Sequence, residues 1–106
     1  VLDPTPLLAA IAADLRAGAE TSRVSGRFHT SFARVLAEAA VLVAQEHSLR
    51  HVALSGGTFQ NRLLLDLLCR RLRERGLTTL HHRWVPPNDG GIALGQAVIA
   101  NASREW

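Results

Sequence analysis

Residues 51–64 read HVALSGGTFQNRLL, a short apolar segment that runs through two glycines into a leucine-rich stretch. Val52 and Leu54 alternate with other residue types, which predicts a strand that Gly56 and Gly57 bring to an end. This order decides the fold class, because a strand followed directly by a helix is the first half of a βαβ unit.

The second half of that unit follows in the sequence. A helix is predicted over about residues 58–74, and Gly76 ends it. A second strand is predicted over about residues 78–83, and two prolines then stop it. Two strands joined by a helix of this length pair in parallel with a right-handed crossover, so we expect an α/β fold.

Helices are predicted on both sides of this unit. Periodic apolar residues indicate one helix that ends at Gly18 and a second that begins near Thr21 and fades at about residues 45–48. The apolar face of the second helix is predicted to contain Phe28, Phe32, Leu36, Ala39 and Val43. A last helix is predicted over about residues 91–101, which gives the order helix–helix–strand–helix–strand–helix in a single partial domain, residues 1–106. A two-stranded parallel sheet leaves at least one edge unpaired, which favours a place in a larger sheet or pairing with a second copy.

Composition excludes several classes of protein. The hydrophobic fraction is 47%, which argues against disorder. No apolar run reaches the roughly 20 residues that cross a bilayer, and the first residues lack the basic segment of a signal peptide. We therefore expect no membrane partner and a cytoplasmic location. The single cysteine, Cys69, fits a reducing compartment, and its place among leucines at helical spacing predicts a core residue.

All 12 basic residues are arginines, and the formal net charge is +3. Five of the arginines lie on or beside the helix predicted over residues 58–74: Arg62, Arg70, Arg71, Arg73 and Arg75. A basic helix is one feature of nucleic-acid-binding proteins. Asp66 and Glu74 interleave with these arginines and permit pairs four residues apart. A solvated helix face is therefore the preferred interpretation, and no nucleic-acid partner is expected.

Two short motifs lie at the carboxyl ends of the predicted strands, where open parallel sheets bind their ligands. In residues 55–61 (SGGTFQN), glycines let a ligand approach the backbone and the following helix offers free N–H groups to a phosphate. A tight strand-to-helix turn is the alternative interpretation. In residues 86–91 (PPNDGG), Asp89 is displayed at a helix start, where it can act as an N-cap, as a carboxylate in a metal or phosphate site, or as both.

The histidines give weaker indications of a site. His81 and His82 are adjacent on a predicted strand, so their side chains are expected to point to opposite faces and not to chelate one metal together. His29 is predicted to be a partly buried and hydrogen-bonded histidine. Ser55 lacks the Gly-x-Ser-x-Gly context of a nucleophile elbow, so no Ser–His–Asp triad is predicted.

Three segments, in the same order and at the same spacing, closely resemble the C-terminal end of the HypF family. They are RFH at 27–29, VALSGGTFQNRLL at 52–64 and HRWVPPNDGGIALGQ at 82–96. The resemblance covers essentially the whole chain, and Thr58 stands where the family more usually has valine. It implies half of a subdomain with the actin/Hsp70-like ATPase fold, from the Kae/TsaD-like last domain of these proteins. A TsaD-like tRNA-modifying enzyme is a weaker match, because that family prefers Asp-Asn-Gly where this chain has Asn88-Asp89-Gly90.

The resemblance also implies a chemistry. HypF proteins use carbamoyl phosphate and ATP to make a carbamoyl-adenylate, and they pass the carbamoyl group to the C-terminal cysteine of HypE, a step toward the cyanide ligands of nickel–iron hydrogenases. Carried over by motif, the nucleotide-binding residues are Ser55, Gly56, Gly57, Asn61, Asn88, Gly90 and Gly91, and Asp89 is a ligand of a divalent metal (zinc, iron or magnesium).

The family's metal-binding histidines lie upstream of the segment that this chain resembles. Residues 1–106 alone are therefore expected to be inactive and to bind no cofactor tightly. The alternative function is a non-catalytic interaction module, which could form a homodimer through the unpaired sheet edge.

Overall fold

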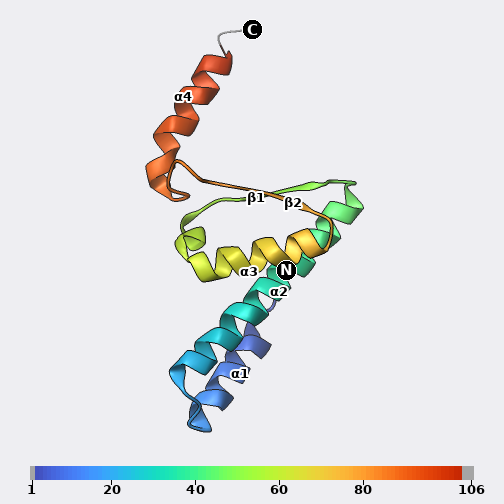
Figure 1. Ribbon diagram of the computed structural model, residues 1–106, viewed down its shortest axis with the longest axis vertical. Coiled ribbons are helices and arrows are strands. Elements are labelled where there is room, and N and C mark those ends of the chain that lie inside the picture. The colour runs from blue at the N-terminus through green and yellow to red at the C-terminus, as the bar shows by residue number, and fades with distance from the viewer. Residues whose placement is uncertain (1, 104–106) are drawn as a thin grey trace.

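The computed structural model describes residues 2–103. Its main elements, in chain order, are α1 (Thr5–Arg16), α2 (Thr21–Glu46), β1 (His51–Leu54), α3 (Arg62–Glu74), β2 (Thr78–His81) and α4 (Ile92–Ala102). Two short 3-10 helices, η1 (Gly57–Gln60) and η2 (Asp89–Gly91), precede α3 and α4. The order confirms the predicted sequence of helices and strands, and Figure 1 shows how the elements are arranged.

The sheet consists of β1 and β2, which pair in parallel, with His51 opposite Thr78 and Leu54 opposite His81. This pairing confirms the predicted α/β unit. Side chains alternate between the two faces of a sheet. Leu54 is 6% exposed and belongs to the core, whereas Leu80, on the other face, is 53% exposed. Within residues 2–103, therefore, only one face of the sheet is covered.

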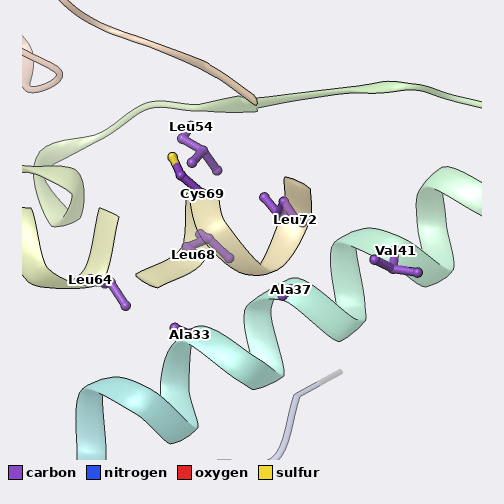
Figure 2. Close-up of a cluster of buried hydrophobic side chains, with 8 residues drawn as sticks. All are labelled: Ala33, Ala37, Val41, Leu54, Leu64, Leu68, Cys69 and Leu72. Atoms are coloured by element: carbon purple, nitrogen blue, oxygen red, sulfur yellow. The ribbon is translucent and has the colours of Figure 1, made fainter. Parts of the chain in front are cut away.

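The covering element is α3, which lies between the sheet and α2 (Figure 1). Leu64, Leu68 and Leu72 recur every four residues, and they are 3%, 2% and 0% exposed. Figure 2 shows these leucines in the buried cluster, with Cys69 close to Leu54 of β1. Cys69 is thus a core residue, as predicted. Each buried leucine contributes about 1.5–3 kcal/mol through removal of its side chain from water, so this stripe supplies much of the stability.

The buried face of α2 differs from the predicted one. The residues of α2 that are buried are mostly small: Val24, Ala33, Ala37, Val41 and Ala44. Phe32 and Leu36 pack only at the margin of the cluster, and Val43 is 52% exposed. The prediction is wrong because it placed the largest apolar residues at the centre of the contact. Two helices approach most closely where the side chains between them are small, and the alanines provide that surface.

The start of α3 also differs from the prediction of one continuous helix over residues 58–74. Residues 57–60 form η1, and Asn61 then adopts an extended conformation with φ −72° and ψ 97°. The Asn61 side-chain Oδ1 accepts a hydrogen bond from the Leu64 backbone N–H at 3.1 Å. This is an N-cap bond, which satisfies a donor that the first turn of a helix leaves free. The helix therefore begins at Arg62.

The arginines of α3 do not form the ion pairs that their spacing permits. Within residues 2–103 the one ion pair joins Arg27 of α2 to Asp14 of α1, at 2.7 Å. Arg70 and Arg73 are exposed to solvent, which confirms a solvated helix face, and the pairs that Asp66 and Glu74 would permit are not formed within residues 2–103. No helix in the described part of the chain is both long and apolar enough to cross a membrane.

The last helix, α4, projects away from the other elements (Figure 1), and the molecule measures 61 × 32 × 23 Å along its principal axes. α4 has no buried residue, and Val98 and Ile99 are 61% and 67% exposed. An apolar helix gains stability in water chiefly by covering its apolar face. Nothing in residues 2–103 covers that of α4.

We expect Leu72→Ala to lower the free energy of unfolding by about 2–5 kcal/mol, because the substitution leaves a cavity in the centre of the core. Leu42→Ala is the matched control on α2, where Leu42 is 67% exposed, and its effect should stay within about 0.5 kcal/mol. Urea denaturation followed by circular dichroism measures both variants. Equal losses would contradict the placement of α3 between the sheet and α2.

Candidate functional site

The two glycine-containing motifs meet at the carboxyl edge of the sheet. Parallel pairing of β1 and β2 brings the ends of both strands to the same edge. The Gly56 backbone N–H donates a hydrogen bond to the Pro87 carbonyl at 2.8 Å. Gly57 lies against Asn88, since a Cβ built on Gly57 would be 3.9 Å from the Asn88 Cβ. The structure therefore joins residues 55–61 and residues 86–91 into one surface.

Two glycines in this surface are required by the backbone itself. Gly56 has φ 105° and ψ 159°, a region that is essentially open only to glycine. A Cβ at Gly91 would lie 2.8 Å from the Pro86 carbonyl oxygen, a contact that real Cβ atoms do not make. Backbone geometry is therefore sufficient to require glycine at positions 56 and 91, whether or not a ligand binds. Glycine at these positions also leaves the backbone of the first loop accessible to a ligand.

The second loop has a capping residue, and it is Asn88. The Asn88 Oδ1 accepts a hydrogen bond from the Gly90 backbone N–H at 3.0 Å, at the start of η2. Asp89 occupies the next position and is exposed, and its carboxylate has no hydrogen bond or ion pair within residues 2–103. The interpretation of Asp89 as the N-cap is therefore wrong. Its carboxylate oxygens stay available to a ligand.

Asp89 is the residue of this surface that the sequence analysis named as a metal ligand. An exposed carboxylate such as Asp89 is a hard oxygen donor that suits a divalent cation. Residues 2–103 contain no group of three or more His, Cys, Asp or Glu side chains that could hold a metal ion.

Ser55 and His82 form a contact that sequence reasoning missed. Ser55 Oγ lies 2.9 Å from His82 Nε2 across the carboxyl edge of the sheet. The strand predicted to reach Arg83 ends at His81, so His82 lies in the loop. The register could have revealed the contact: Leu54 pairs with His81, which places the next residue of each strand side by side.

The Asn61 side chain forms hydrogen bonds with two residues, Leu64 and His29. In addition to the N-cap bond to Leu64, the Asn61 Nδ2 lies 2.8 Å from Nε2 of His29 on α2. His29 Nδ1 in turn lies 2.8 Å from the Ser25 carbonyl oxygen. The half-buried His29 is thus hydrogen-bonded through both ring nitrogens, which confirms the prediction for this residue.

A groove of about 430 Å³ opens beside the two loops. Phe59 and Pro86 give it apolar walls, and two arginines, Arg62 and Arg83, are among its lining residues. Trp84 also lines it and is 96% exposed, which is unusual for the largest apolar side chain. The positive charge of this groove adjoins the glycine loops, so the surroundings suit an anionic ligand.

Comparison with known families gives a direct match. The family described as carbamoyltransferase, Kae1-like domain, second subdomain, matches residues 1–96. The chain belongs to the HypF carbamoyltransferase family. The carbamoyltransferase HypF2 of Cupriavidus necator is 44% identical over 99 residues, which are 93% of this chain and 12% of that protein. The HypF of Rhodobacter capsulatus is 38% identical over 104 residues, or 98% of this chain and 13% of that protein.

Two solved HypF structures share the fold. A crystal structure of full-length HypF in the phosphate- and nucleotide-bound form matches with a TM-score of 0.89 and 42% identity over 98% of this chain. The structure of HypF from T. kodakarensis matches with a TM-score of 0.81 and 29% identity over 99%. This chain covers 14% of each of these proteins. The fold is therefore the Kae1-like second subdomain, a small part of a HypF protein.

We expect Gly56→Ala and its neighbour Gly57→Ala to differ sharply in stability. Alanine at Gly56 must adopt a positive φ, which should cost about 1–3 kcal/mol. Gly57 has an ordinary backbone conformation, and its added methyl meets only a normal van der Waals contact, so its effect should stay within about 0.5 kcal/mol. Urea denaturation of the two variants tests this. The same loss in both would mean that the conformation of Gly56 is not the constraint.

Proposed function

We propose that this chain supplies one side of the nucleotide site of a HypF carbamoyltransferase. In the proposed reaction, water cleaves carbamoyl phosphate to carbamate and phosphate, and the carbamate then reacts with ATP to give a carbamoyl-adenylate and pyrophosphate. The carbamoyl group then passes to the C-terminal cysteine of a HypE-like acceptor, toward cyanide ligands of nickel–iron hydrogenases. The proposal rests on family membership and on the surface where the two glycine loops meet.

The observation that carries the proposal is the hydrogen bond from Gly56 to Pro87 at the carboxyl edge of a parallel sheet. That edge is where open α/β sheets bind their ligands. A relative with 42% identity was crystallised with phosphate and nucleotide bound, which supports the same class of ligand here. We propose the following nucleotide-binding residues: Ser55, Gly56, Gly57, Asn61, Asn88, Gly90 and Gly91.

Each part of this surface has a physical task. The backbone at Gly57 lies open and lets a phosphate or sugar approach without a side chain in between. The N–H groups at the start of η1 and α3 favour the negative charge of phosphates. Asp89 is proposed as one ligand of a divalent metal, whose other ligands come from elsewhere in a HypF protein. Such a metal would neutralise phosphate charge when bound.

Turnover is proposed for the whole protein, not for residues 1–106. The chain spans 12% to 14% of the length of most of the relatives that it matches. A carbamoyl-adenylate is labile, so its site must be shielded from water. Here the loops are exposed, and the described residues contain no group of three or more His, Cys, Asp or Glu side chains that could hold a metal ion.

A second candidate function is a non-catalytic association module. The outer edges of β1 and β2 carry no further strand within residues 2–103, and such edges can pair with another chain. The exposed apolar residues of α4 also favour association with another chain. A dimer formed by a whole protein that binds no ATP would favour this candidate over the first.

The catalytic proposal predicts that Gly57→Ala in the whole carbamoyltransferase weakens ATP binding about 10-fold or more, because the methyl occupies space that the nucleotide needs. Isothermal titration with ATP measures the binding, and pyrophosphate release with carbamoyl phosphate measures the reaction. Gly26→Ala, on α2 with nothing within 4 Å of the added methyl, is the matched control and should change neither. Unchanged ATP affinity in Gly57→Ala would count against the proposed site.

Asp89→Asn in the whole protein should lower the affinity for the divalent metal by more than about 10-fold, because the substitution removes a charged ligand but keeps its size. Metal content after dialysis, measured by inductively coupled plasma mass spectrometry, reads this out. Asp66→Asn on the exposed face of α3 is the control and should retain the wild-type metal content. Equal metal in both variants would remove Asp89 from the metal site.

A further inference from the structure

His29 links α2 to the first glycine loop. The bond from Asn61 Nδ2 to His29 Nε2 measures 2.8 Å and joins residues 32 positions apart in the chain. Phe28 packs edge-on against the His29 ring, with centroids 5.4 Å apart and planes at 86°. The imidazole is therefore fixed by a neighbouring ring as well as by its hydrogen bonds. Within residues 2–103, its hydrogen bond to the proposed nucleotide surface is the one to Asn61.

The directions of these hydrogen bonds follow from their chemistry. The Ser25 carbonyl can only accept, so the nearby His29 Nδ1 must carry the proton. In the neutral ring Nε2 is then an acceptor, and it receives an N–H from the Asn61 amide. The amide oxygen of Asn61 accepts from Leu64. These two bonds fix the orientation of the Asn61 amide. If the amide were flipped, its NH2 group would face the Leu64 N–H, and both groups are donors.

This arrangement leaves one amide hydrogen of Asn61 without an acceptor in residues 2–103. Asn61 is exposed at the loop surface, so that N–H can be donated to a ligand. We propose that His29 is a positioning residue, which holds the Asn61 amide so that its second N–H is presented to the nucleotide. The proposal rests on the proposed function, in which Asn61 contacts that nucleotide.

The proposed positioning would favour nucleotide binding because the Asn61 side chain is already ordered before the nucleotide binds. A side chain that must be immobilised by its ligand spends part of the binding free energy on lost rotamer freedom. With His29 as acceptor, the orientation of Asn61 is already set in the free protein. Without it, the N-cap bond alone restrains the amide, and the proposed N–H donor is less well ordered.

The test uses the whole carbamoyltransferase and its affinity for ATP, measured by isothermal titration. Asn61→Ala should weaken ATP binding about 5- to 10-fold, the value of one good hydrogen bond. His29→Ala should weaken it about 2- to 10-fold through lost ordering. His29→Gln places an amide oxygen near the position of Nε2, so it should bind ATP within about twofold of the wild type. His47→Ala, at the exposed C-terminal end of α2, is the matched control.

The double variant with both His29→Ala and Asn61→Ala distinguishes a positioning role of His29 from a general loss of folding. In the Asn61→Ala background, His29→Ala should cause no further loss of ATP affinity, because the residue through which it acts is gone. Additive losses, or no rescue by His29→Gln, would overturn the positioning role. Loss in Asn61→Ala but wild-type affinity in His29→Ala would overturn it while leaving the nucleotide site intact. Wild-type affinity in Asn61→Ala would instead reject Asn61 as a nucleotide contact, and the role of His29 would fall with it.

Discussion

Leu64, Leu68 and Leu72 of α3 are buried in one cluster with the alanines of α2 and with Leu54 of β1. This packing holds α3 against one face of the β1–β2 pair and gives the crossover its place. Because the two strands are parallel, both leave the sheet at the same edge. The loops that follow them must meet there, so the position of the candidate site depends on the burial of these leucines.

At that edge, backbone geometry largely determines the conformation of the two loops. The unusual conformation of Gly56 aims its N–H at the Pro87 carbonyl, and the absence of a side chain at Gly91 lets the second loop close on itself. Side chains then lock the loops: Ser55 to His82, Asn88 to Gly90, and Asn61 to His29. The resulting surface offers open backbone and one free carboxylate, beside a groove that carries arginines.

The same structure leaves much of its apolar surface exposed within the described residues. One face of the sheet and most of the apolar residues of α4 are uncovered within residues 2–103. The chain makes up 12% to 14% of most of the HypF proteins that it matches. An apolar surface of this kind is stable in water when other parts of a polypeptide cover it. The lack, in the described residues, of any group of three or more His, Cys, Asp or Glu side chains that could hold a metal ion fits the same account.

The sequence by itself determined the elements and the two loops, because local signals suffice for them. Leucine periodicity marks α3, and the glycine and proline positions mark where strands end and turns begin. Half-buried His29 followed from the same kind of pattern. The family resemblance, carried by the two loop motifs in tandem, was confirmed. Asn61 as a break before α3 was open to the same reasoning, since asparagine favours N-caps, but it was missed.

Only the tertiary structure decided which side chains meet. The pairs Ser55–His82 and His29–Asn61 lie 27 and 32 residues apart, and no local pattern encodes such distances. The buried face of α2 was decided in the same way, because the approach of α3 selected alanines over larger residues. Local preferences set the conformation of a segment, whereas the contacts between segments depend on how closely their surfaces fit, and that fit exists only in the folded chain.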